Sequence, residues 1–423
     1  MIISEILDTL MAELQDKLIT TRNYLVRQIQ FPETPHKIQV AIGMRRVGKT
    51  CLLLQVLRGL ISDQKLPRHR ILYLNFEDDR LLPCAEAKLR SLLEGFYQHY
   101  PENHDHLCYL FLDEIQNVDG WATVIRRFFD TKKVKIYLSG SSAKLLSKEI
   151  ASSLRGRALT TEVWPYSFEE NLIAQGISVQ TEHFGEKWTH QYMHHLKHYL
   201  DRGGFPETFW VPEINRRQLL QDYVEVVIMR DLIERYQISN IALVKYMIHF
   251  LLKNTGTSFS VHKLANDVKS QGLLGARNTI YDYLSYIEDA YLAFAVPLFS
   301  ESVRKTHSNP RKIYSIDSGL TRAFSFSLQK NYGHLFENLV FLDFKRKGHK
   351  IFYYLTQERY EIDFLTEDPL GVLKLHQVVW DTSDPKTIAR EERALHIAEK
   401  ELQIEGEIIT PERYLQQICT LKS

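Results

Sequence analysis

Two glycines, a lysine and a threonine near the start of the chain have the spacing that binds a polyphosphate. Residues 43–50 read Gly-Met-Arg-Arg-Val-Gly-Lys-Thr, between an apolar run at 38–42 and a helix-like run at 51–57. The glycines let successive backbone N–H groups turn toward phosphates, Lys49 reaches the β- and γ-phosphates, and Thr50 offers its hydroxyl to Mg²⁺. The alternative is a chance match in a basic loop, which the flanking runs disfavour. The predicted nucleotide-binding residues are Gly43, Arg45, Arg46, Val47, Gly48, Lys49, Thr50 and Cys51.

Two adjacent carboxylates follow a second apolar run. Residues 107–112 are Leu-Cys-Tyr-Leu-Phe-Leu, and Asp113 and Glu114 come next. A buried strand would deliver Asp113 to the magnesium beside Thr50, so Thr50 and Asp113 are the predicted metal ligands. Glu114 would orient and polarise the attacking water, and Lys49 would stabilise the phosphate charge. A glutamate in that place predicts hydrolysis in addition to binding.

Further polar residues follow the next strand-like run. Residues 139–142, Ser-Gly-Ser-Ser, come after the run at 134–138, and we predict that Ser141 hydrogen-bonds the γ-phosphate or the attacking water. The alternative is a serine turn that caps a helix beginning near Ala143. Arg155 and Arg157 are candidates to reach the γ-phosphate of a neighbouring subunit and neutralise charge in the transition state. A surface salt bridge is the alternative for each arginine.

The elements that must position these residues follow from the pattern of apolar runs. Runs at 37–42, 71–76, 107–112, 134–138 and 159–163 alternate with helix-length segments, which predicts a parallel α/β sheet covered on both faces. Residues 3–30 have helical spacing, and Pro32 and Pro35 end that helix. Arg22 and Arg27 within it could line an adenine or phosphate pocket, although nothing in the sequence shows this.

Composition limits the class of protein. The 423 residues predict two to four domains, and the 44% hydrophobic and 25% charged content is that of a globular protein. A net charge of +1 gives no overall attraction to nucleic acid. The four cysteines are scattered and no 18 apolar residues run together. These features predict a cytoplasmic protein with no membrane segment.

The order of these motifs resembles the AAA+ class of P-loop ATPases. The residues within these motifs are similar to those of one prokaryotic branch, in which the ATPase is joined to a C-terminal domain of uncharacterised role. That resemblance implies ATP and Mg²⁺ as ligands, covers nearly the whole chain and brings no known substrate. It rests on residues 43–50, on 112–116 with Trp121, on 139–142, on Gly156 and Arg157, and on 164–170 and 203–207.

The rest of the chain is predicted to form three further domains. After an N-terminal helix and AAA+ core at 1–165, we expect a helical lid at 166–244, a winged helix at 245–325 and a nuclease-like domain at 326–423. Arg216, Arg217 and Arg230 are candidate nucleotide sensors of the lid, although Arg230 could equally form an ion pair with Asp231.

The winged helix has two interpretations. Its second helix, 276–289, offers Arg277 and Asn278 but also Asp282, Glu288 and Asp289, which would repel a phosphate backbone. We therefore favour an interdomain or protein-contact module over DNA binding. The basic residues of the wing, which would make at most weak phosphate contacts, are Arg304, Lys305, His307, Arg311 and Lys312.

Residues 326–423 resemble the PD-(D/E)XK nuclease fold, whose metal-binding acids match Glu337 and Asp363. The third acid is replaced by Gln377, the lysine that should follow is absent, and Lys374 lies on the opposite face by strand alternation. A hard divalent ion prefers carboxylate oxygens. We therefore predict a nuclease-like domain without cleavage activity, with a residual metal site as the alternative.

These features lead to one main hypothesis and two alternatives. The main hypothesis is an ATPase that couples hydrolysis to rearrangement of its C-terminal domains, acts on an unknown protein client and forms a homo-oligomer with an arginine acting in trans. The first alternative is an ATP-switched protein that binds or cleaves nucleic acid. The second is a monomeric nucleotide-gated scaffold with very slow turnover.

Overall fold

The chain falls into two compact units in the computed structural model, Met1–Val163 and Trp164–Ser423. The structure describes residues 3–21, 24–141, 154–177, 185–300, 310–325 and 331–420. Candidate residues Arg22, Ser142, Arg304, Lys305 and His307 lie outside these ranges. In the described part of the chain, no helix is both long enough and apolar enough to cross a bilayer.

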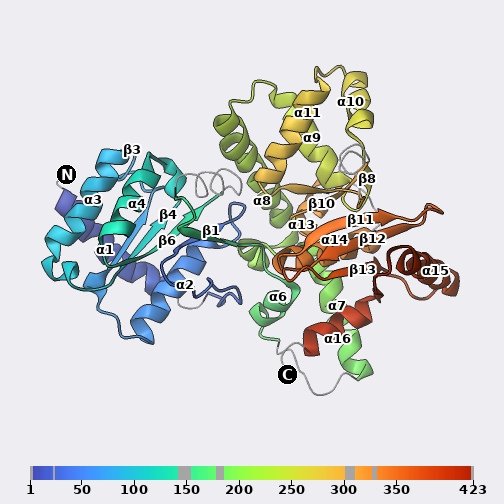
Figure 1. Cartoon of the computed structure of the whole chain (residues 1–423), viewed down its shortest axis with the longest axis horizontal. Helices are drawn as coiled ribbons and strands as arrows, with labels where there is room; N and C mark the ends of the chain where they lie inside the picture. Colours follow the sequence, from blue (N-terminus) through green and yellow to red (C-terminus); the bar gives the residue numbers. More distant parts are fainter. Residues whose placement is uncertain are drawn as a thin grey trace. The chain divides into compact units, whose positions relative to one another are not determined.

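The first unit is built on a five-stranded parallel sheet with the order β2-β4-β6-β1-β7 (Figure 1). All five predicted apolar runs became its strands, which confirms the α/β prediction. One strand, β2, separates β1 from β4 in sequence, and β4 lies between β2 and β6 in the sheet. The strands are β1 (Ile38–Ile42), β2 (Ile71–Asn75), β4 (Cys108–Asp113), β6 (Val134–Gly140) and β7 (Ala158–Glu162), with a separate short pair, β3 (Cys84–Ala85) and β5 (Val118–Asp119).

Helices cover both faces of this sheet. Leu53 and Leu57 of α2 pack with Phe111 in one apolar cluster, whereas α1, α3 and α4 pack their apolar side chains in a larger second cluster. Because both faces are covered, β2 and β4 are almost continuously apolar up to the polar residues Asn75 and Asp113 at their carboxyl ends. These helices are α1 (Ile3–Thr20), α2 (Lys49–Ser62), α3 (Glu86–His99) and α4 (Trp121–Thr131).

The N-terminal helix is shorter than predicted. It ends at Thr20, where the hydroxyls of Thr20 and Thr21 donate to the carbonyl oxygens of Asp16 and Lys17 at 2.8 and 2.7 Å. The prediction of helix as far as residue 30 was wrong because a tertiary contact overrides the helical spacing. The backbone N–H of Arg27 donates to the side chain of Gln55 on α2, which returns a hydrogen bond to the Arg27 carbonyl.

The second unit begins with helices and ends with two small sheets. The described residues between 166 and 244 are mostly helical, as predicted for this stretch, and the sheets of this unit have the orders β8-β10-β9 and β11-β12-β13-β14. The first elements are α6 (Phe168–Ala174), α7 (Glu186–Arg202), η5 (Pro206–Trp210), α8 (Glu213–Val226), the π-helix η6 (Val227–Glu234), α9 (Ile241–Lys253), β8 (Ser258–Phe259), α10 (Val261–Ser270) and α11 (Arg277–Asp289). The remaining ones are β9 (Ala293–Val296), β10 (Arg311–Ser315), α13 (Ser318–Phe324), α14 (Tyr332–Arg346), β11 (Lys350–Leu355), β12 (Glu361–Glu367), β13 (Leu373–Val378), α15 (Pro385–Leu402), β14 (Gly406–Ile409) and α16 (Pro411–Thr420).

A buried carboxylate explains the glycine pair at 203–204. Asp317 Oδ2 accepts a hydrogen bond from the backbone N–H of Gly204 at 2.6 Å, and Asp317 Oδ1 accepts one from Leu320 at 3.1 Å. Gly203 has a φ of +79°, and a Cβ there would lie 2.1 Å from Asp317 Oδ1. The glycine pair therefore lets the end of α7 approach the start of α13, a contact that no local sequence pattern indicates.

Replacing Gly203 by alanine is expected to destabilise the second unit. The new Cβ would clash with Asp317 and force a positive φ on a residue that avoids it, a combined cost of about 3 kcal/mol or more. Gly185→Ala is the matched control, because within the described residues no heavy atom lies within 4 Å of a Cβ built there, and its φ is −87°. Urea unfolding of both variants measures the difference, and equal stability would contradict the packing argument.

Several surface assignments in the second unit were wrong. Lys312 is buried, with 2% of its surface exposed, so it offers no phosphate contact. Two acids of α11 point to structural partners instead of solvent: Glu288 accepts a hydrogen bond from the backbone N–H of Ala295, and Asp289 accepts one from the hydroxyl of Tyr236. Lys312 therefore cannot attract a DNA phosphate, and Glu288 and Asp289 repel one less than the sequence suggested.

Candidate active site

The loop between β1 and α2 has the backbone geometry that its glycines predict. Gly43 has a φ of +152°, and a Cβ there would lie 2.2 Å from the carbonyl oxygen of Val163. Gly48, directly before α2, has a φ of +99°. Residues other than glycine could not adopt these backbone conformations without strain. The loop therefore presents its N–H groups and the N-terminus of α2 at one place, a geometry suited to an anion.

Lys49 lies inside this loop. Its ammonium donates to the carbonyl oxygens of Gly43 and Met44 at 3.1 and 3.0 Å and lies 3.6 Å from Glu114 Oε1. Only 5% of Lys49 is exposed. A buried ammonium held by carbonyls and one carboxylate can exchange these partners for phosphate oxygens of higher charge.

Asp113 ends β4 at the carboxyl edge of the sheet and receives three hydroxyl groups. The Tyr73 hydroxyl donates to Asp113 Oδ2 at 2.9 Å, the Ser139 hydroxyl donates to Oδ1, and Thr50 also hydrogen-bonds this carboxylate. Burial, followed by the charge of Glu114, raises the pKa of Asp113, and the three hydroxyls oppose that shift. Thr50 and Asp113, the predicted metal ligands, are far apart in sequence but lie within hydrogen-bond distance of each other in the fold.

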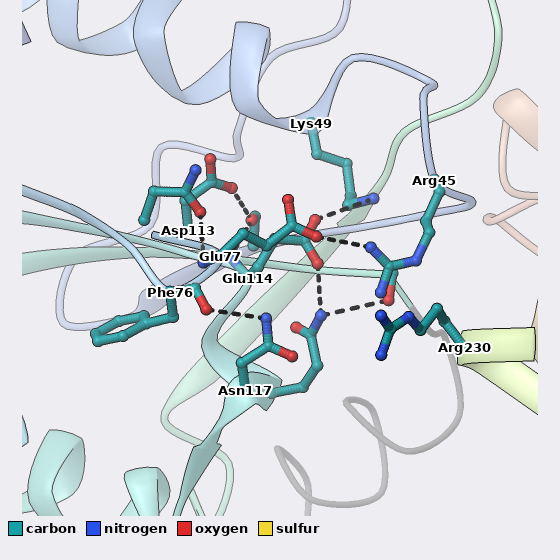
Figure 2. A network of polar contacts seen from close by, with 12 residues as sticks. Arg45, Lys49, Phe76, Glu77, Asp113, Glu114, Asn117 and Arg230 are labelled. Carbon is teal, nitrogen blue, oxygen red and sulfur yellow. Dashed lines mark hydrogen bonds and ion pairs between the residues drawn. The ribbon is translucent and has the colours of Figure 1, made fainter. Parts of the chain in front are cut away.

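Glu114 adopts a left-handed backbone conformation, with a φ of +53°. Its N–H donates to Ser139 Oγ at 2.9 Å, which fixes this turn at the end of β4. The side chain points toward Lys49, as Figure 2 shows, and it accepts a hydrogen bond from Gln116. Burial alone would raise the pKa of Glu114, but the charge of Lys49 and the Gln116 hydrogen bond outweigh it and lower the pKa. The carboxylate is therefore held in its charged form, as a base requires.

Supporting contacts hold the loops around these groups. Arg45 donates to Glu77 Oε1 at 2.7 Å, and Asn117 donates to the carbonyl oxygen of Phe76 at 3.1 Å (Figure 2). Arg46 is exposed with a φ of +69°. Cys51 is half-buried with a free thiol, and burial raises the pKa of that thiol. Of the predicted nucleotide-binding side chains, Arg45 and Arg46 are therefore placed at the rim of the loop.

The contacts of the predicted sensor, Ser141, and of the two candidate arginines, Arg155 and Arg157, give weaker support to their predicted roles. Ser141 accepts a hydrogen bond from Gln116 at 3.3 Å, so it lies beside the partner of Glu114. Arg157 pairs with Asp130 at 2.9 Å, which fits the salt-bridge alternative. Arg155 is exposed, with a φ of +46°. Between the two arginines, Arg155 is thus the better candidate to contact another molecule.

The three candidate lid arginines make local contacts in the second unit. Arg216 is buried and lies 3.8 Å from Glu213, and Arg217 donates to the carbonyl oxygen of Ala323 at 3.1 Å. Arg230 pairs with Glu234 at 3.0 Å, so the anticipated partner Asp231 was wrong. These contacts assign none of the three arginines to the nucleotide.

Arg27, which the sequence placed on a helix and left open as a residue of an adenine or phosphate pocket, contacts the phosphate-binding loop. Its guanidinium is buried beneath the phosphate-binding loop and donates to the carbonyl oxygen of Val47 at 2.8 Å. The atom Nη1 would lie 3.3 Å from a Cβ on Gly48. Arg27 therefore supports the loop through the carbonyl of Val47, and no spacing rule links these two residues, which are 20 positions apart.

Arg27→Ala is expected to weaken nucleotide binding about tenfold. Loss of a charged hydrogen bond of roughly 1.5–3 kcal/mol leaves the Val47 carbonyl without its partner and loosens the loop. Arg58→Ala is the matched control, since Arg58 contacts Leu18 and Thr21 at the end of α1 instead of the loop. Titration with a fluorescent ATP analogue compares the two, and equal affinities would contradict the supporting role.

Comparison with known proteins defines the class of the first unit. Residues 35–172 match the family described as an AAA domain, so this part of the chain has the core fold of a P-loop NTPase. Residues 193–330 match a domain of unknown function, DUF8612. This second match crosses the boundary predicted between residues 244 and 245, and the four-part domain division stays a prediction.

The chain belongs to the same family as the uncharacterized protein MJ1544 of Methanocaldococcus jannaschii. The two are 35% identical over 385 residues, which cover 90% of this chain and 82% of that protein. An uncharacterized protein of Haemophilus influenzae is 28% identical over 400 residues, covering 94% and 95%. The Walker-type ATPase PABY2304 of Pyrococcus abyssi aligns with a TM-score of 0.42 and 13% identity, over 74% of this chain and 94% of that one.

Proposed function

We propose that the protein binds ATP and hydrolyses it in a magnesium-dependent reaction. The observation that carries the proposal is the convergence of Thr50, Asp113, Lys49 and Glu114 at the carboxyl edge of the sheet. Asp113 binds the Thr50 hydroxyl, and Glu114 lies 3.6 Å from Lys49. The match to an AAA domain supports the same reaction.

The side chains fit a magnesium ion. The Thr50 hydroxyl and the Asp113 carboxylate are hard oxygen donors already within hydrogen-bond reach of each other. When bound there, Mg²⁺ would neutralise charge on the β- and γ-phosphates. The hydroxyls of Tyr73 and Ser139 also donate to the Asp113 carboxylate and hold it in place.

Each remaining residue has a separate task. The loop N–H groups bind phosphate oxygens, and Lys49 exchanges its carbonyl partners for the β- and γ-phosphates. That exchange would release Glu114 from its nearest cation, and its carboxylate would then polarise the attacking water. Gln116 bridges Glu114 and Ser141, so it orients the base and links it to the candidate sensor.

The reaction is tested by phosphate release from ATP with the purified full chain. We expect turnover with Mg²⁺ and none with EDTA. Nucleotide binding measured separately by calorimetry distinguishes an inactive enzyme from one that binds no ATP. Tight binding of ATP with no release of phosphate under any metal condition would leave a nucleotide-gated scaffold instead of an ATPase.

Arg155 is proposed to act in trans on the nucleotide of a neighbouring copy. Its exposure at the end of a positive-φ turn supports this assignment. Arg155→Ala should lose hydrolysis about 10³-fold or more and keep ATP binding. Mixing this variant with Glu114→Gln should restore part of the activity, because each supplies what the other lacks. Failure of the mixture to recover any activity would contradict an arginine acting in trans.

Hydrolysis is proposed to drive a rearrangement of the second unit against a protein client. The family match identifies neither the client nor the coupling. A pull-down from a lysate of the native cell, with the Glu114→Gln variant bound to ATP, is the experiment that would identify the client. The competing hypothesis of nucleic-acid binding predicts DNA affinity that falls steeply with salt, so a flat salt dependence or no binding would remove it.

A further inference from the structure

Two carboxylates matching the metal site of PD-(D/E)XK nucleases converge in the second unit. Glu337 comes from α14 and Asp363 from β12, and both contact the same ammonium group. That ammonium belongs to Lys312 of β10, a strand of the other small sheet. The acids are therefore brought together as a metal site would require, but a lysine lies between them.

The ammonium makes three short contacts. Lys312 Nζ lies 2.8 Å from Glu337 Oε1, 2.8 Å from Asp363 Oδ1 and 2.9 Å from Glu361 Oε1. The Lys312 side chain is only 3% exposed, and those of Glu337 and Asp363 are each 11% exposed. Lys312 thus donates hydrogen bonds to Glu337 and Asp363, forms an ion pair with Glu361 and is closed off from solvent.

A divalent ion and this ammonium cannot share the site. Ca²⁺ or Mg²⁺ would have to lie about 2.0–2.6 Å from oxygens of both acids, which is the space that Lys312 Nζ fills. Burial alone would lower the pKa of Lys312, but the carboxylates raise it well above its ordinary value. Lys312 therefore stays protonated and remains between the two carboxylates.

The other polar atoms around the acids are also engaged. Tyr314 donates to Glu337 Oε1 at 2.6 Å, and Asp363 Oδ2 accepts the backbone N–H of Val378 at 2.9 Å. Gln377 accepts the N–H of Asp363 and donates to Glu391. Lys374, the only lysine on β13, pairs with Glu407 on β14 at 3.0 Å. In the described residues, no group of three or more His, Cys, Asp or Glu side chains is arranged to hold a metal ion.

We propose that Lys312 substitutes for the divalent cation of a nuclease-like site, so that this acid pair fastens β10 to α14 and β12 instead of binding metal. The cross-link joins the sheet β8-β10-β9 to the sheet β11-β12-β13-β14 through one buried charge cluster. The second unit then needs no divalent ion to hold these elements together, whichever nucleotide the first unit binds.

Metal titration of the full chain tests this inference without nucleotide. The parent protein carries Thr50→Ala and Asp113→Asn, which remove both proposed metal ligands of the first unit. Mn²⁺ binding is followed by electron paramagnetic resonance and by the shift in melting temperature. The parent should show no saturable site that depends on Asp363. Adding Lys312→Met should create one Mn²⁺ site, at least tenfold tighter than any in the parent, because two buried acids lose their cation.

Controls separate this site from surface binding. Asp363→Asn added to Lys312→Met should abolish the new site. Lys350→Met is the matched control, since Lys350 is exposed and pairs with Glu367 on the edge of the same sheet at 2.8 Å, and it should create none. If Lys312→Met does not fold, Lys312→Gln replaces it, because the amide keeps a donor for the acids.

Two results would overturn the inference. One is a Mn²⁺ site in the parent that Asp363→Asn removes, which would show that metal displaces the lysine. The other is a folded Lys312 variant that binds no Mn²⁺. Either result leaves the ATPase proposal untouched, because the titration uses no nucleotide and no residue of the first unit beyond the two already replaced.

Discussion

Glu114→Gln is expected to stop phosphate release while leaving ATP binding intact. The amide keeps the size of the side chain and can still hydrogen-bond Gln116 through its oxygen, but it cannot accept a proton from water. Loss of a positioned general base typically costs about 10²- to 10⁴-fold in rate. Phosphate release gives the rate, and calorimetry with ATP and Mg²⁺ gives the affinity.

The control for this variant is Glu94→Gln. Glu94 forms an exposed ion pair with Arg127 at 2.8 Å on the surface of the same unit, and such pairs contribute about 0–1 kcal/mol. It should hydrolyse ATP at the normal rate. Hydrolysis by Glu114→Gln at the rate of the unmodified protein would reject Glu114 as the base.

Lys49→Ala is expected to abolish measurable ATP binding. The ammonium is buried in the loop, where it already binds two carbonyl oxygens and lies 3.6 Å from Glu114. Removing one partner of a buried charged contact costs about 2–5 kcal/mol, which weakens binding roughly 30- to 4000-fold. Titration with ATP in the presence of Mg²⁺ measures the loss.

Lys133→Ala serves as the comparison for Lys49→Ala. Lys133 is exposed and donates to the carbonyl oxygen of Asp105, so its loss should not change the affinity. Thermal unfolding of both variants shows whether Lys49→Ala also disturbs the loop. Retention of full ATP affinity by a folded Lys49→Ala protein would reject the loop as the phosphate site.

The sequence was sufficient for the sheet and for the main residues of the candidate site. Strands bury continuous apolar runs and end where polar residues begin, so β1, β2, β4 and β6 could be read directly. The glycines and Lys49 obey a local spacing, because a loop of fixed length surrounds the phosphates. Thr50 and Asp113 then meet because parallel strands end at one edge.

Partners that come from elsewhere in the chain could not be predicted. Arg27 contacts Val47 from a segment, residues 24–30, that is not helical, whereas its spacing favoured a helix. Asp317 meets Gly203 and Gly204 across 113 residues. No periodicity encodes such a pair, since long-range packing selects it after the elements form.

The local pattern by itself determined the class of protein, because phosphate binding, strand burial and helix spacing are all properties of short segments. Tertiary structure alone decided what the charged residues do, since burial and distance depend on which elements pack together. Lys312 is the clearest case: in sequence it is one more basic residue of a wing, and in the fold it is enclosed by carboxylates from a helix and a strand 25 and 51 residues away.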